Sequence, residues 1–264
     1  MTRMPTYFIS HGGGPWPWVP QMRARMAQLE TALAAMPGAQ PAVPKAVLMV
    51  SGHWETDEVR VMHAARPPMV YDYSGFPPYT YEIQYKAPGA PALAERTAQL
   101  IAAAGIEVAL DDTQGYDHGT FAPMEVMYPD ADMPLYQLSI RKDYDPRKHI
   151  ELGRALAPLR DEGVLIVGSG LSYHNLRLMG PEAREPSAAF DVWLNGAMRL
   201  PPAERTQAML KWESAPAARI CHPQEDHLVP LFVALGAAED EAAAVPYHET
   251  TMMGGVTASN FRFG

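Results

Sequence analysis

Histidines follow three of the apolar runs that are typical of buried β-strands. His11 follows the run TYFIS, His53 comes shortly after AVLMVS, and His174 comes a few residues after VLIV. Ligands of open parallel sheets bind beyond the carboxyl ends of the strands, so we expect these three rings to meet although they are far apart in the sequence. Imidazole is the commonest metal ligand and transfers protons near neutral pH. The spacing therefore predicts a metal site with an acid/base histidine.

Other histidines lie in polar or glycine-containing segments. His118 stands in the segment DHG, and His222 and His227 bound the segment HPQEDH, so we expect them in loops or at the start of a helix. A single histidine at a strand end is more often a capping or hydrogen-bonding residue than a metal ligand. The prediction of a metal site therefore depends on their joint placement.

Strand-like runs alternate with amphipathic, alanine- and leucine-rich stretches along the whole chain. This alternation predicts one α/β domain over residues 1–264, with a mainly parallel central sheet flanked by helices and the metal site at the carboxyl ends of the strands. Strands are expected at 6–10, 46–51, 58–64, 106–110, 134–139 and 164–167, with the tail 245–263 returning as strand. Helices are expected at 20–36, 90–104, 145–161, 187–198, 202–212 and 224–235, and a long loop rich in tyrosine, proline and glycine at 66–88.

Composition excludes several classes of protein. The chain has 21 basic and 30 acidic residues, a formal net charge of -9 and no strongly basic stretch, which argues against binding of nucleic acid or an anionic membrane. No apolar stretch approaches the ~20 residues of a membrane span. The single cysteine, Cys221, cannot form an intrachain disulfide, and no signal-peptide pattern precedes the first strand. We expect a cytoplasmic protein.

A hydrolase is the main alternative to consider. The segment HGGG that begins at His11 is similar to the oxyanion-hole element of some esterases, but that chemistry requires a G-x-S-x-G nucleophile elbow. The nearest segment, GLSYH at 170–174, lacks the second glycine. A serine hydrolase is therefore disfavoured. A zinc-dependent hydrolase that uses the same histidines stays open, as does a protein that only binds metal or small aromatic molecules.

Five motifs, in order along the chain, resemble those of the class III extradiol ring-cleavage dioxygenases, and most closely their DOPA 4,5-dioxygenase-like bacterial branch. The resemblance extends from near the N-terminus to about Gly236. Many members have an HGSP-like first motif, in which Gly13-Gly14 here replaces a small polar position. The motifs are His11-Gly12-Gly13-Gly14-Pro15, Gly52-His53-Trp54, Asp117-His118-Gly119, Gly168-Ser169-Gly170 with His174-Asn175-Leu176, and His222-Pro223 through His227-Leu228-Val229-Pro230-Leu231.

The resemblance implies a metal site at His11 and His53. Many members complete the site with a glutamate at the start of a helix, giving a 2-His-1-carboxylate set. The alignment puts His227 at that position, so the site is expected to be all-histidine, unless Glu225 or Asp226 supplies a carboxylate. The implied cofactor is one divalent ion, Fe(II) for ring cleavage or Zn(II), since both metals have been described in this branch.

The resemblance also implies roles for the remaining candidates. His174 corresponds to the catalytic base, and His118 to a second histidine that handles substrate or protons. His222 is either an alternative ligand to His227 or part of the substrate pocket. Arg177 is a candidate partner for a substrate carboxylate, with an ordinary surface arginine as the alternative. The implied activity is cleavage of the ring of a catecholic, DOPA-like substrate with O₂.

Overall fold

The computed structural model describes residues 2–264 and contains one eight-stranded sheet. The strand order across the sheet is β4-β3-β5-β2-β6-β1-β8-β7. The strands are β1 (Thr6–Ser10), β2 (Ala46–Thr56), β3 (Val59–Met62), β4 (Val108–Asp111), β5 (Leu135–Arg141), β6 (Val164–Gly170), β7 (Ala243–Met252) and β8 (Val256–Phe263).

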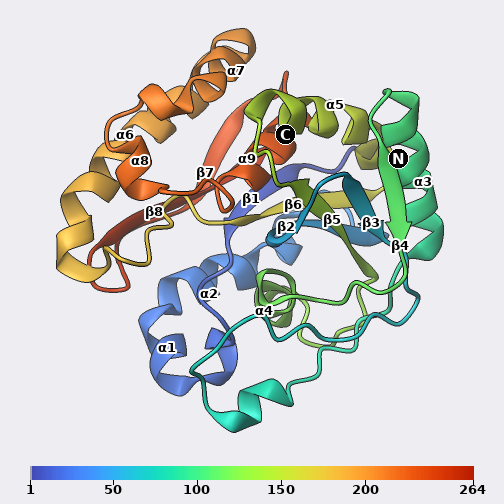
Figure 1. Ribbon diagram of the computed structural model, residues 1–264, viewed down its shortest axis with the longest axis horizontal. Helices are drawn as coiled ribbons and strands as arrows, with labels where there is room; N and C mark the ends of the chain where they lie inside the picture. The colour runs from blue at the N-terminus through green and yellow to red at the C-terminus, as the bar shows by residue number, and fades with distance from the viewer. Residues whose placement is uncertain (1) are drawn as a thin grey trace.

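Helices cover both faces of this sheet (Figure 1). Helices α5 and α9 pack together on one face, and α1, α2 and α4 lie on the other. Among the described residues, no helix has the length and apolar character needed to cross a membrane. The helices are α1 (Pro20–Arg25), α2 (Ala27–Ala35), α3 (Pro91–Ala103), α4 (His118–Met127), α5 (Pro146–Asp161), α6 (Arg184–Met198), α7 (Pro202–Leu210), α8 (Ala218–Cys221) and α9 (Val229–Gly236).

The centre of the sheet is parallel, as the sequence predicts. Strand β6 pairs in parallel with both β1 and β2, and β2 pairs in parallel with β5. Every residue of β1 and of β6 is buried, which explains why these strands are continuous apolar runs with no alternation. The predicted single α/β domain with a mainly parallel sheet is confirmed.

The structure differs from the predicted elements in several places. The tail forms two strands, because β7 and β8 make an antiparallel hairpin whose second strand pairs with β1. The expected helix 20–36 is broken at Met26, and helix α9 begins only at Val229, so His227 lies in the irregular segment before it. Helix α4 stands where no helix was expected. Its N-cap is Asp117, whose carboxylate accepts a hydrogen bond from the backbone N–H of Thr120.

Gly170, at the end of β6, joins two histidine-bearing segments. Its carbonyl accepts a hydrogen bond from the N–H of His11 (3.1 Å), and the N–H of Leu171 donates to the carbonyl of His227 (3.0 Å). A Cβ atom on Gly170 would lie 2.0 Å from the carbonyl oxygen of His227. Only glycine therefore lets the segment that carries His227 approach the end of β6.

Substitution Gly170→Ala is expected to lower the free energy of unfolding by about 1–3 kcal/mol, because the new methyl group must displace backbone. It should also weaken the binding of any metal ion that His227 holds, since His227 moves with that backbone. Gly196→Ala is the matched control, because a Cβ there meets nothing within 4 Å. Urea unfolding and zinc titration of both variants measure the effect, and a Gly170→Ala variant as stable as the wild type contradicts the role of this close approach.

Candidate metal centre and active site

Five histidine side chains line one cavity of about 460 Å³. His11 follows β1, His53 lies near the end of β2, and His174 follows β6. His118 is the first residue of α4, and His227 comes just before α9. The cavity therefore lies beyond the carboxyl ends of the parallel strands, where binding sites of such sheets are found. Three of its histidines come from strand ends and two from the starts of helices.

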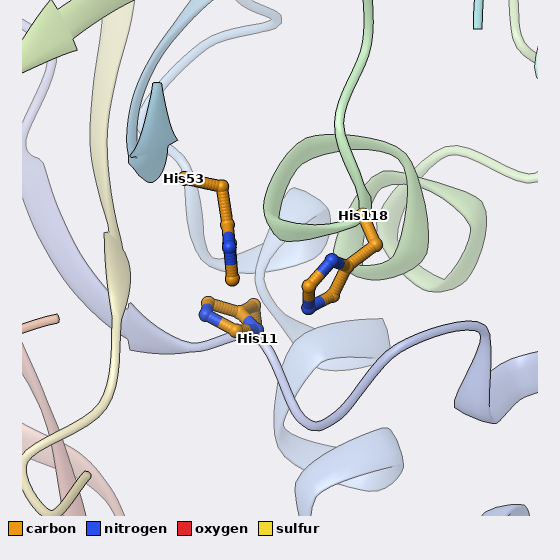
Figure 2. A group of neighbouring side chains, drawn as sticks. All are labelled: His11, His53 and His118. Atoms are coloured by element: carbon orange, nitrogen blue, oxygen red, sulfur yellow. The ribbon is translucent and has the colours of Figure 1, made fainter. Parts of the chain in front are cut away.

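Three of these rings form a compact group. The nitrogen atoms of His11, His53 and His118 that could bind a metal lie within 4.8 Å of one another. Figure 2 shows the three side chains converging from the end of β1, the end of β2 and the start of α4. Their ring centroids are 4.0 Å apart for His53 and His118, and 5.0 and 5.3 Å apart for His11 with each of these two. This group could hold a metal ion.

His227 connects this group to a second one. His227, His174 and Asp226 also place candidate ligand atoms within 4.8 Å of one another. Nε2 of His227 lies 3.1 Å from Nε2 of His53. The motif resemblance gave His118 a role in handling substrate or protons and not in binding the metal. The structure brings its ring as close to His11 and His53 as a metal ligand would be. His118 and His227 are thus both placed to complete a site.

The facing Nε2 atoms of His53 and His227 fit a shared cation. Nδ1 of His227 lies 2.6 Å from a carboxylate oxygen of Asp226, and Nδ1 of His53 lies 3.3 Å from one of Asp72. The carboxylate of Asp226 accepts a hydrogen bond from Nδ1 of His227, which leaves Nε2 of that ring with a lone pair. The separation of 3.1 Å fits a hydrogen bond from Nε2–H of His53 to this lone pair, and with the Nδ1–H tautomer of His53 it fits one shared cation. Two nitrogens bound at ~2.0–2.1 Å to one tetrahedral ion would lie roughly 3.3–3.4 Å apart.

Burial keeps these rings in the neutral form that binds metal. Burial, and then the neighbouring histidines, lower the pKa of both His11 and His53 well below the usual range. Burial also lowers the pKa of His227 to about 4. Both ring nitrogens of His11 are buried without a hydrogen-bond partner among the described residues. Such an orphaned donor set, made of neutral imidazoles, is suited to Zn(II) or Fe(II).

The carboxylate of Asp226 contacts the outer nitrogens of two cavity histidines, His174 and His227. Burial alone would raise its pKa, but contacts with His174 and His227 outweigh burial and hold the pKa well below the usual range. The carboxylate lies 3.7 Å from Nδ1 of His174, whose ring stacks on that of His227 with centroids 3.4 Å apart. Glu225, the other acidic alternative, forms an ion pair with Arg219 and does not line the cavity.

Three residues, Asp117, Gly119 and Asp72, position His118 at the site. Asp117 caps α4, and its carboxylate also accepts a hydrogen bond from Ser51 of β2 (2.8 Å). A Cβ on Gly119 would lie 2.9 Å from a ring carbon of His53, so glycine lets α4 begin against β2. Asp72, from the tyrosine-rich loop, binds Nδ1 of His118 at 2.8 Å. No motif or spacing indicates Asp72, because only tertiary contact connects that loop to the histidines.

The structure does not bring His222 or Arg177 to the lining of the cavity. Helix α8 ends at Cys221 and leaves His222 fully buried, with Nε2 3.0 Å from the carbonyl oxygen of Ser172. Burial lowers the pKa of His222 to about 3. Arg177 lines a neighbouring surface depression that shares His174 with the cavity. Roles for these two residues in substrate binding stay predictions, without support from their placement.

Comparison with known proteins assigns this fold and site to a class. The family model described as the catalytic LigB subunit of aromatic ring-opening dioxygenase matches residues 6–264. The chain belongs to this family and is an aromatic ring-opening dioxygenase, which confirms the resemblance seen in the sequence motifs.

Individual relatives cover almost the whole chain. A 4,5-DOPA dioxygenase extradiol from Beta vulgaris is 38% identical over 98% of this chain and 96% of the relative. A protein of the same name from Escherichia coli K12 is 33% identical, with 100% and 96% covered. The crystal structure of an uncharacterized protein from Escherichia coli K12 superposes with a TM-score of 0.80 at 29% identity, covering 99% of this chain and 100% of that one.

Proposed function

We propose that this protein opens the ring of a DOPA-like catechol with O₂ at a bond beside the two hydroxyl groups, with one divalent metal ion held by His11, His53 and His227. The observation that carries the proposal is the convergence of five histidines on one cavity at the carboxyl ends of the parallel strands. The 4,5-DOPA dioxygenase names of the relatives support a catechol of this kind.

His227 is the proposed third ligand because its Nε2 faces Nε2 of His53 at 3.1 Å, with both Nδ1 atoms directed at carboxylates. A divalent ion bound here would favour the ionised form of the catechol oxygens, and iron would also supply redox chemistry toward O₂. Three neutral imidazoles also suit zinc, so Zn(II) is a second candidate for the bound ion.

His174 is the proposed base. Its Nδ1 faces Asp226 at 3.7 Å, which leaves Nε2 to accept a proton from a catechol hydroxyl. His118 is the proposed second proton carrier, because its Nδ1 is held by Asp72 and its ring lines the same cavity. A histidine whose outer nitrogen is held by a carboxylate, as in His118, can accept a proton at its inner nitrogen.

The walls of the cavity suit a flat, largely apolar ring. Eight apolar or aromatic side chains line it beside the five histidines, three carboxylates (Glu55, Asp72 and Asp226) also line it, and no lysine or arginine stands among the described lining residues. We expect the carboxylate of a DOPA-like side chain to extend toward the rim, and its pairing with Arg177, which lies outside the cavity lining, stays a prediction. The apolar and aromatic lining residues are Met22, Tyr73, Phe76, Leu171, Tyr173, Leu176, Met179 and Met253.

The proposal is tested by O₂ uptake after anaerobic reconstitution with Fe(II). The panel contains DOPA, the amine that lacks its carboxylate, and catechol without a side chain. We expect stoichiometric O₂ consumption and a yellow ring-opened semialdehyde with at least one of them. Stoichiometric metal without O₂ uptake on any catechol would overturn the proposal and favour the zinc hydrolase or the metal-binding protein, which ester and amide substrates would distinguish. A cytoplasmic location also stays a prediction.

A further inference from the structure

Asp72 contacts two of the cavity histidines at once. One carboxylate oxygen lies 2.8 Å from Nδ1 of His118 and accepts a hydrogen bond from the backbone N–H of the same residue at 3.0 Å. The other oxygen lies 3.3 Å from Nδ1 of His53. Asp72 stands on the long loop between β3 and α3, far in sequence from both histidines.

The loop holds Asp72 in place from both sides. The hydroxyl group of Tyr71 donates to the carbonyl of Ile83 at 2.6 Å, and that of Tyr73 donates to the carbonyl of Thr80 at 2.5 Å. The ring of Tyr73 also packs edge-on against His118, with centroids 5.9 Å apart. The loop on both sides of Asp72 is therefore held in place, and the carboxylate itself is bonded to His118.

We propose that Asp72 is a positioning residue that fixes the Nδ1–H tautomer of both His53 and His118, so that both Nε2 atoms present lone pairs to the cavity. The inference rests on the proposed function, because it takes Nε2 of His53 as a metal ligand. A carboxylate bonded to the outer nitrogen of a ligating histidine sets the tautomer and the ring orientation. One carboxylate does this here for two rings with different tasks.

Asparagine is the informative replacement, because it keeps the shape of the side chain and changes only its hydrogen bonding. A carboxamide offers one acceptor oxygen and one NH₂ donor. At His118 the oxygen is favoured, since the backbone N–H and the ring N–H of that residue both need an acceptor there. The NH₂ group then faces His53, whose Nδ1 must become the acceptor. The ring proton of His53 moves to Nε2, and that nitrogen can no longer bind metal.

The test compares Zn(II) affinity of the wild type, Asp72→Asn and Asp112→Asn by competition with a chelator. Asp112→Asn is the matched control, because it changes an aspartate that contacts Nδ1 of His63 at 2.7 Å outside the cavity. We expect zinc to bind about 10–100-fold more weakly to Asp72→Asn and equally well to Asp112→Asn. Nitrogen-15 NMR of the metal-free variant should show the proton of His53 on Nε2, and on Nδ1 in the wild type.

Unchanged zinc affinity of Asp72→Asn, or a His53 proton that stays on Nδ1, would overturn the proposal. A thermal midpoint close to that of the wild type shows that the variant is folded. Asp72→Ala provides a second variant, which should also weaken zinc binding because both rings lose their acceptor. These measurements use neither catechol nor O₂. A wild-type protein that binds zinc tightly but opens no ring would therefore contradict the proposed function and leave the role of Asp72 standing.

Discussion

Replacing His53 with alanine is expected to abolish metal binding and ring cleavage together. The ring of His53 lies at the centre of the cluster, with centroids 4.0 Å from His118, 4.6 Å from His227 and 5.0 Å from His11. Its loss removes one ligand from either candidate set of three. We expect metal affinity and kcat/KM to fall by on the order of 10³-fold or more, because the ion supplies several kcal/mol of charge stabilisation in the reaction.

Metal content after reconstitution and O₂ uptake measure this result, and the same assays identify the third ligand. If His227 is that ligand, His227→Ala loses the metal while His118→Ala keeps it. The opposite pattern would assign the third position to His118. His63→Ala is a suitable control, because His63 contacts Asp112 and Glu95 outside the cavity. A His53→Ala variant that binds zinc like the wild type would refute the proposed metal centre.

The centre of the fold could be predicted because its strands are buried on both faces. Strands β1, β2 and β6 appear in the sequence as continuous apolar runs, and their parallel pairing puts their carboxyl ends on one edge. The meeting of His11, His53 and His174 follows from that single rule. The motif resemblance assigned roles to His118 and His227, which no periodicity indicates.

The remainder depends on tertiary contacts that leave no local pattern. Asp72 belongs to a loop whose proline and tyrosine content indicates packing and not chemistry. Helix α4 was not predicted because it contains Pro123, a residue that usually interrupts helices, although Asp117 caps its first turn. His222 follows a short helix, and its burial beneath Ser172 is decided by Phe190 and Trp212, which pack against its ring. Sequence spacing alone could not separate this buried histidine from one that lines the cavity.

Replacing His174 with alanine is expected to stop turnover while the metal stays bound. His174 contacts the site through Asp226 and through its stacking on His227, and it does not belong to the group formed by His11, His53 and His118. Removing a general base typically costs 10²–10⁴-fold in rate, so kcat should fall by about that factor. Zinc or iron content should stay close to that of the wild type, because no proposed ligand is lost.

A more acidic catechol can show whether His174 acts as a base or has only a structural role. 4-Nitrocatechol is largely ionised near neutral pH, so it has less need of a group that accepts its proton. If His174 acts as the base, the loss caused by His174→Ala should be at least about tenfold smaller for binding and turnover of 4-nitrocatechol than for DOPA. Equal losses for the two substrates, or loss of the metal, would show that His174 supports His227 and transfers no proton. Because Asp226 contacts both histidines, only a comparison that varies the acidity of the substrate distinguishes the two roles.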